Sequence, residues 1–117
     1  MQDLSNYEKD VRSWGNFERF TLNEKSTVKI ITVNPEQEFS LQSHKHRDEF
    51  WHIISGSGVI TLDQDHRAIR AGENFFSPAG REHRMKGGPE GLVFLEISFG
   101  DFDEKDITRF EDDYGRA

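Results

Sequence analysis

The sequence contains no cysteine, which excludes disulfides and thiolate metal ligands. Secreted domains of this size often depend on disulfides, so a cytoplasmic location is expected. No stretch approaches the roughly 20 apolar residues that a membrane-spanning helix needs. The N-terminal residues 1–15 also lack the apolar run of a signal peptide.

A basic surface is missing as well. The 15 basic residues are outnumbered by 22 acidic ones, and the net charge is −7. This balance argues against a nucleic-acid interface and against binding to an anionic membrane. The 117 residues fit one domain spanning 1–117, whose modest core draws on ten Phe, two Trp and two Tyr.

Apolar residues occur in short runs between turn signals, a pattern typical of all-β domains. The expected strands are Asn16–Leu22, Thr27–Val33, Phe39–His46, Glu49–Ser55, Val59–Asp63, Ala68–Ala71, Asn74–Ser77, His83–Lys86 and Leu92–Phe99. So many short strands, separated by Gly and Pro turns, predict a sandwich or jelly roll.

The two ends are expected to form short arms. The first dozen residues predict a helical or irregular arm, and Asp103–Tyr114 predicts a short helix with Asp103 as its N-cap. We expect Trp14, Phe17 and Tyr114 to pack these arms onto the barrel.

Histidines concentrate in one of the expected strands. Residues two apart on a strand share a face, so His44 and His46 should point the same way as Gln42. A bulge at residues 47–48 would bring Glu49 to that face, with Asp48 as the alternative carboxylate.

Such a set of imidazoles and a carboxylate suits Zn²⁺, Mn²⁺, Fe²⁺, Co²⁺ or Ni²⁺. The competing interpretation is that these histidines are ordinary surface residues of a strand. The same alternation places Trp51 and Ile53 beside Glu49 and turns His52 away, toward packing or an interface, while His66 lies in a polar surface turn.

Two motifs favour the metal site. His44 to Gly56 reads H-x-H-x2-E-x6-G, and Gly72 to His83 reads G-x5-P-x-G-x2-H, with Ser57–Ala71 between them. Together they resemble the paired motifs of the cupin superfamily. This resemblance implies an all-β, single-domain jelly-roll barrel over about residues 16–100, with one divalent metal ion in its mouth.

In that resemblance the ligands are His44, His46, Glu49 and His83. The sequence departs from the pattern at three places. Glu38 stands in the slot of the opening glycine, only two residues separate His46 from Glu49, and Gly87 stands where Asn is frequent.

Further segments resemble one branch of the cupins, the type II mannose-6-phosphate isomerase cupin. This module often forms the C-terminal part of bifunctional guanylyltransferase/isomerase enzymes. The segments are R-S-W-G-N-F-E from Arg12, V-K-I from Val28, S-L-Q from Ser40, H-R-D-E-F-W from His46 and the closing D-I-T-R-F-E-D-D-Y-G-R from Asp106.

The resemblance implies conversion of mannose 6-phosphate to fructose 6-phosphate, and a homodimer. The chain has no Gly-rich phosphate loop, so guanylyl transfer is not expected. Glu36, Phe50 and His52 depart from the family pattern and leave the exact sugar open.

This isomerisation needs a base, an electrophile and a positively charged binding site for the phosphate. Glu96 and Lys29, each between apolar strand residues, are the candidate catalytic groups, although either could instead lie on an outer face. Candidates for substrate binding are Gln42, Arg84, Arg12 and Arg116.

Two other functions compete with the isomerase. One is a non-catalytic cupin that binds a sugar or sugar nucleotide. The other, favoured less by the segments above, is an iron-dependent dioxygenase, because three His and one Glu also serve that chemistry.

Overall fold

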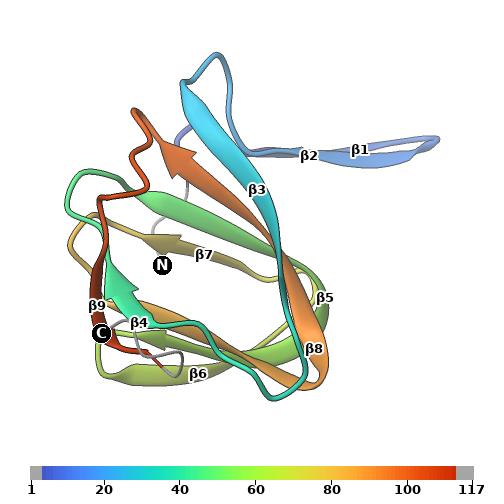
Figure 1. The fold of residues 1–117 in the computed structure, drawn as a ribbon. Helices are drawn as coiled ribbons and strands as arrows, with labels where there is room; N and C mark the ends of the chain where they lie inside the picture. Colours follow the sequence, from blue (N-terminus) through green and yellow to red (C-terminus); the bar gives the residue numbers. More distant parts are fainter. Residues whose placement is uncertain (1–3, 113–117) are drawn as a thin grey trace.

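The computed structural model describes residues 4–112, and all of their regular structure is β-strand (Figure 1). The strands are β1 (Glu8–Arg12), β2 (Gly15–Arg19), β3 (Ser26–Val33), β4 (Leu41–Ser43), β5 (Glu49–Leu62), β6 (Asp65–Arg70), β7 (Asn74–Ser77), β8 (His83–Phe99) and β9 (Thr108–Glu111). No helix within these described residues is long and apolar enough to cross a membrane.

Two long bent strands, β5 and β8, organise the barrel by pairing with each other along nearly their whole length. The first half of β5 and the second half of β8 lie between β7 and β3, which gives the order β7-β5-β8-β3, here called sheet I. Their other halves lie in the order β6-β5-β8-β4-β9, here called sheet II. The chain therefore forms the jelly roll expected from the sequence.

Glycines allow both strands to bend at the same level. Gly56 and Gly91 have φ of +80° and +82°, in the left-handed region that glycine adopts without strain. The pairing of β5 with β8 shifts register on both sides of Gly56. A Cβ atom at Gly56 would lie 2.1 Å from the carbonyl oxygen of Gly91, so the two backbones meet too closely for a side chain.

The core lies between the two sheets. Trp51 and Ile53 from sheet I pack with Phe94, while Ile60 and Met85 come from the sheet II halves of the same two strands. Along β5, Trp51 and Ile53 are buried in this core, whereas Phe50 points to the outer face and packs against Phe20.

The structure corrects several expectations about elements. The sequence predicted two separate strands on either side of residues 56–58 and two more on either side of residues 87–91. In the structure the first pair is one continuous bent strand, β5, and the second pair is β8. The strand expected over Phe39–His46 shortens to β4, because the chain bends at residues 45 and 46. Neighbouring strands supply the hydrogen bonds that keep a bent strand continuous, and this support is not visible in a local pattern.

The arms differ from the sequence prediction too. The prediction of a C-terminal helix is wrong, because part of that segment forms β9, which pairs with β4. The N-terminal arm is the hairpin β1–β2, which projects from the barrel beside the start of β3 (Figure 1). Trp14 at its turn is 72% exposed and does not pack on the barrel as expected; Tyr114 lies outside the described residues.

We expect Gly56→Ala to destabilise the fold much more than Gly72→Ala. Gly72 has φ of +92°, so alanine carries similar backbone strain of about 1–2 kcal/mol at either position. Only at Gly56 would the new Cβ meet backbone, which adds a clash of about 2 kcal/mol or more. Urea unfolding of the two variants measures the difference, and equal losses would contradict the role given to the Gly56–Gly91 approach.

Candidate metal centre

Three buried side chains converge near one end of the barrel. They are His44, just after β4, Glu49, the first residue of β5, and His83, the first residue of β8. One potential ligand atom of each lies within 4.8 Å of the other two. Glu49 Oε1 is 3.4 Å from His44 Nε2 and 3.5 Å from His83 Nε2. Bringing these strand ends together assembles a set of donors suited to a divalent transition metal.

The two oxygens of the Glu49 carboxylate have different surroundings. Oε2 accepts hydrogen bonds from Arg47 Nε at 3.1 Å and from Ser98 Oγ at 2.9 Å. Oε1 is buried and has no hydrogen-bond partner among the described residues. Leaving a buried carboxylate oxygen unpaired is costly, and this one faces two imidazole nitrogens. The arrangement fits a bound cation between the three side chains.

Asp106 holds His44 in a ligating orientation. His44 Nδ1 donates to the backbone carbonyl of Asp106 at 2.7 Å, which leaves the lone pair of the neutral ring on Nε2, toward Glu49. The Asp106 carboxylate accepts the backbone N–H groups of Lys45 and His46 at 2.8 and 2.9 Å. The sequence marked Asp106 only as the start of a family-like segment and did not reveal this role.

Electrostatics favour the protonation states that metal binding requires at Glu49 and His83, but not at His44. Burial alone would raise the pKa of Glu49, but His44, His83 and Arg47 outweigh it and lower the pKa to about 2. Burial lowers the pKa of His83 to about 4, against the opposing charge of Glu49. At neutral pH the carboxylate is therefore ionised and the His83 ring neutral. The pKa of His44 is raised instead. Burial lowers it, but Glu49 and the Asp106 carbonyl together outweigh the effect of burial.

The structure does not bring His46 to this cluster. The chain bends at residues 45 and 46, so the alternation that would align His46 with His44 does not apply, and the His46 side chain is exposed. Asp48, the alternative to Glu49, is exposed as well and accepts the backbone N–H of Ala79 at 2.8 Å.

Arg47 takes the buried position that the sequence suggested for His46. Besides binding Glu49, it donates through Nη1 to the Asp103 carbonyl at 3.1 Å, and its Nη2 lies 3.4 Å from His44 Nε2. Its guanidinium carbon is 4.5 Å from the centre of the Phe102 ring. A buried arginine this close to the candidate ligands was missed, because nothing in the local pattern distinguishes it from its charged neighbours.

A second group of candidates lines the inner face of sheet I. Glu96 lies opposite both Lys29 and Trp51 in the strand register, and its Oε2 accepts the Trp51 indole N–H at 3.2 Å. Trp51 in turn packs edge-on against the His83 ring at 4.9 Å between centroids. Burial and the charge of Glu49 raise the pKa of Glu96 to about 7. Lys29 Nζ reaches Glu104 at 3.3 Å and lies 4.5 Å from the Phe102 ring centre.

Gln42 lies directly opposite His83 in the pairing of β4 with β8, so their side chains share a face. Its amide oxygen accepts a hydrogen bond from Ser40 Oγ at 2.9 Å. The structure thus brings Gln42 and Glu96 to the barrel interior with the cluster. Lys29 lies on the same face of sheet I, but its side chain is 39% exposed.

Two of the three predicted phosphate-binding arginines, Arg84 and Arg12, are not brought there. Arg84 donates to the Phe39 carbonyl at 2.8 Å and to Glu111 at 3.1 Å, and Glu38 lies 3.4 Å away. Arg12 lies in the projecting hairpin, paired with Asp10. Arg116 lies outside the described residues. The remaining histidines serve elsewhere: His52 contacts Asn74, and His66 contacts Thr61.

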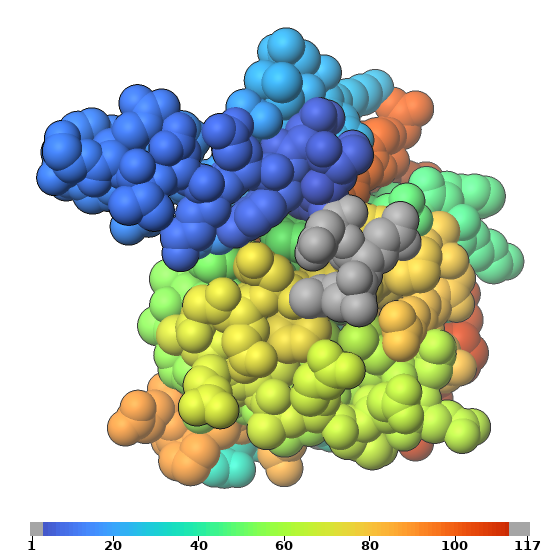
Figure 2. Space-filling model, turned by 180° about the vertical axis from the view of Figure 1, so that it is seen from behind, coloured from blue at the N-terminus to red at the C-terminus, as the bar shows by residue number. Residues whose placement is uncertain are grey.

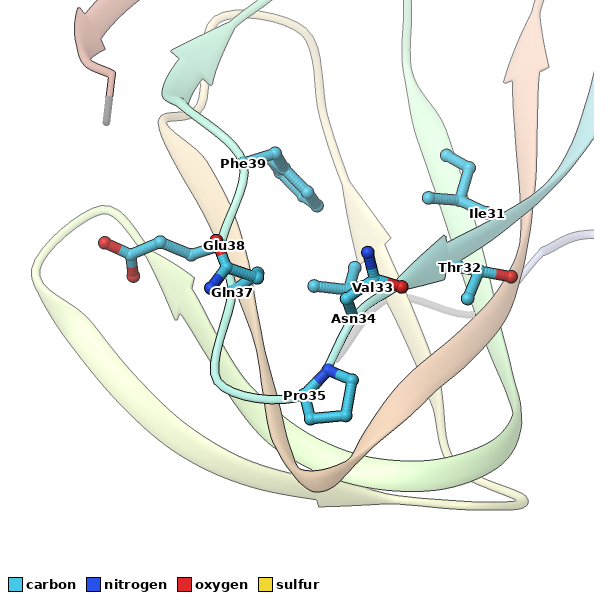
Figure 3. Close-up of a pocket in the computed structure, with 8 residues that line it drawn as sticks. All are labelled: Ile31, Thr32, Val33, Asn34, Pro35, Gln37, Glu38 and Phe39. Carbon is cyan, nitrogen blue, oxygen red and sulfur yellow. The ribbon is translucent and has the colours of Figure 1, made fainter. Parts of the chain in front are cut away.

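A separate pocket of about 600 Å³ opens between β3 and the following segment, residues 35–39. Figure 3 shows Ile31, Val33 and Phe39 turned toward this space, with Glu38 turned away. No member of the His44–Glu49–His83 cluster lines it. Its lining residues offer few of the side chains that bind a metal or a phosphate.

The comparisons with known proteins identify the family. The sequence profile described as "Mannose-6-phosphate isomerase C-terminal" matches residues 1–112. The xanthan biosynthesis protein XanB of Xanthomonas campestris pv. campestris is 36% identical over 113 residues, covering 95% of this chain and 24% of that protein. A mannose-1-phosphate guanylyltransferase of Escherichia coli is 34% identical over 108 residues, covering 91% and 23%.

Solved structures agree on the fold. A conserved protein from Klebsiella pneumoniae with a double-stranded β-helix domain superposes with a TM-score of 0.65 at 22% identity, covering 75% of this chain and 76% of that one. The chain belongs to the mannose-6-phosphate isomerase C-terminal family and has the cupin fold. It spans about a quarter of the length of the curated relatives it matches.

We expect His83→Ala to abolish stoichiometric metal binding and His46→Ala to leave it intact. Loss of a residue that only orients a ligand costs about 10–100-fold in affinity, so loss of a ligand costs more than about 100-fold. Metal content by mass spectrometry, and competition with a chromogenic chelator, measure both. Full metal content in His83→Ala, or an equal loss in His46→Ala, would contradict the assignment.

Proposed function

We propose that this protein is a metal-dependent aldose–ketose isomerase that converts mannose 6-phosphate to fructose 6-phosphate. The observation that carries the proposal is the shared interior of the barrel, where the unpaired Glu49 oxygen, two imidazoles and the protonatable Glu96 come together. Membership of a family described by this activity supports the choice of substrate.

The residues that would hold the ion are His44, Glu49 and His83. When bound there, a divalent ion would polarise the sugar oxygens as a Lewis acid. Arg47 and Ser98 fix one oxygen of Glu49, which leaves the other free toward the ion. Asp106 fixes the ring of His44 in the same way.

Glu96 is the proposed base that carries the proton between C1 and C2. A pKa near 7 suits this task, because a carboxylate of that basicity both accepts and returns a proton near neutral pH. The Trp51 indole orients its carboxylate. Lys29, opposite Glu96 on the same face, is the proposed donor to a sugar oxygen, and Gln42 a further contact for a sugar hydroxyl.

The phosphate needs positive charge, since the net charge of −7 opposes a dianion. Arg47 and Lys29 both approach the Phe102 ring beside the candidate site and are the proposed cations. Arg84 is bound by two carboxylates and two backbone carbonyls. It directly follows His83 on β8, so its side chain points away from the cluster and it is a weaker candidate. Arginine's planar guanidinium also suits a phosphate better than an ammonium does.

We expect the purified chain to turn over mannose 6-phosphate in a coupled assay, to lose this activity with a chelator and to regain it with a divalent metal. Metal-free protein incubated without added ion is the control. Saturable sugar binding without turnover would favour a non-catalytic cupin. Oxygen uptake with an aromatic or thiol substrate would favour a dioxygenase, and either result would overturn the isomerase proposal.

We also expect kcat/KM to rise with pH, since Glu96 must lose its proton to act as the base. The apparent pKa should lie at or below about 7, because an ion on Glu49 would weaken the charge that raises the pKa of Glu96. Glu96→Gln should lower kcat by about 10²–10⁴-fold with metal content unchanged. Glu90→Gln, on the exposed part of the same strand, is the matched control. An unaltered pH profile in Glu96→Gln would exclude it as the base.

A further inference from the structure

Gln42 lies on the same strand face as the first histidine of the metal cluster. It precedes His44 by two residues, and β4 continues through Ser43 between them. The alternation that fails at residues 45 and 46 therefore still holds between Gln42 and His44. The pair of side chains that the sequence placed at 44 and 46 on one face is found at 42 and 44.

The neighbouring strand supports this placement independently. Gln42 lies directly opposite His83 in the pairing of β4 with β8. Directly opposite residues project from the same face of a sheet, with Cβ atoms about 4.5–5.5 Å apart. Gln42 thus has one histidine of the cluster as its neighbour along the chain and the other as its neighbour across the sheet.

The amide of Gln42 offers an oxygen with a free lone pair. Ser40 Oγ donates to Gln42 Oε1 at 2.9 Å, and Ser40 is itself buried. A carbonyl oxygen has two lone pairs, so this hydrogen bond leaves one of them available. Hydrogen bonds of this kind orient metal-binding side chains in proteins. Ser40 therefore holds Gln42 as Asp106 holds His44.

The backbone at Glu36 gives a separate indication. Glu36 has φ of +63°, in the left-handed region that favours glycine, whereas Glu38 has no positive φ. The Glu36 N–H donates to the carbonyls of Gly87 and Gly88, each at 3.2 Å. Figure 2 shows these two segments meeting at the lower edge of the molecule, in blue-green and orange. The glycine-like conformation thus lies two residues before the slot assigned from the sequence.

A shift of two residues makes the first motif regular. With residue 36 as its opening position, the paired ligand positions are Gln42 and His44 in place of His44 and His46. Four residues then separate His44 from Glu49, so the gap before the glutamate is no longer short. The strand face, the cross-strand register and the backbone conformation all agree with this frame.

We propose that Gln42 is the fourth metal ligand of this protein and binds the ion through Oε1. The ion then has two imidazoles, one carboxylate oxygen and one neutral amide oxygen as its protein ligands. The NH2 group of the same amide stays available to a sugar hydroxyl, so this role is compatible with the substrate contact proposed above. The inference rests on the metal-binding part of the proposed function and not on the identity of the sugar.

Co²⁺ binding to the purified chain and its variants tests the assignment. Gln42→Leu should weaken Co²⁺ binding at least about tenfold, since even loss of a residue that only orients a ligand costs that much. Its visible Co²⁺ absorption should shift as well, because one ligand is lost. Gln64→Leu is the matched control, because Gln64 lies in the exposed turn between β5 and β6.

Gln42→His tests the ligand position directly. X-ray absorption of the Co²⁺-loaded protein should count two imidazoles in the wild type, from His44 and His83, and three in Gln42→His. The variant should also shift the ratio of Zn²⁺ to Mn²⁺ affinities at least about tenfold toward Zn²⁺, since imidazole suits Zn²⁺ and a carbonyl oxygen suits Mn²⁺. A merely structural role for Gln42 would change neither the count nor this ratio.

Unchanged Co²⁺ affinity and absorption in a folded Gln42→Leu would overturn the proposal, and circular dichroism checks the folding. Should that variant not fold, Gln42→His decides, and a count that stays at two imidazoles contradicts the assignment. Three imidazoles in the wild type would contradict it too. A wild type that binds no Co²⁺ would overturn this proposal together with the metal-dependent function, whereas binding without sugar turnover would overturn the isomerase alone.

Discussion

The buried carboxylate of Glu49 is the group on which the rest of the site depends. A charge taken out of water is tolerated only when it is paired and hydrogen-bonded. Here Arg47 and Ser98 satisfy one oxygen, while the other faces the imidazoles of His44 and His83 and accepts no hydrogen bond from residues 4–112. The same interactions keep Glu49 ionised, since they outweigh the effect of burial on its pKa. The cluster is therefore poised to accept a cation.

The segment between β8 and β9 links this cluster to the mouth of the barrel. Asp103 and Asp106 accept hydrogen bonds from Arg47 and His44, and Phe102 lies against Arg47 and Lys29. The groups proposed to bind the phosphate are thus tied to those that would hold the metal. A substitution in the phosphate-binding group should therefore affect the metal-binding group, and the reverse, because Arg47 contacts both Glu49 and this segment.

Sheet I reverses the usual distribution of polarity. Its inner face carries Lys29 and Glu96 near the cluster, and its outer face is apolar with Val28 and Ile30 in solvent. The inner charges lie in a space that the barrel partly shields from water, where electrostatic interactions are stronger.

The sequence by itself determined the jelly roll and all three residues of the candidate metal cluster. The two spaced motifs brought together His44, Glu49 and His83, and alternation along the strands placed Trp51 and Gln42 on the inner face. It left open which face Glu96 occupies, and the structure turns Glu96 inward, against Trp51. Tertiary structure decided what local alternation could not. The bend at residues 45 and 46 turned His46 outward and left Arg47 buried. The C-terminal segment became β9 because β4 offered it a strand to pair with. The period of two holds only while a strand continues, and whether it continues depends on hydrogen bonds from residues far away in the chain.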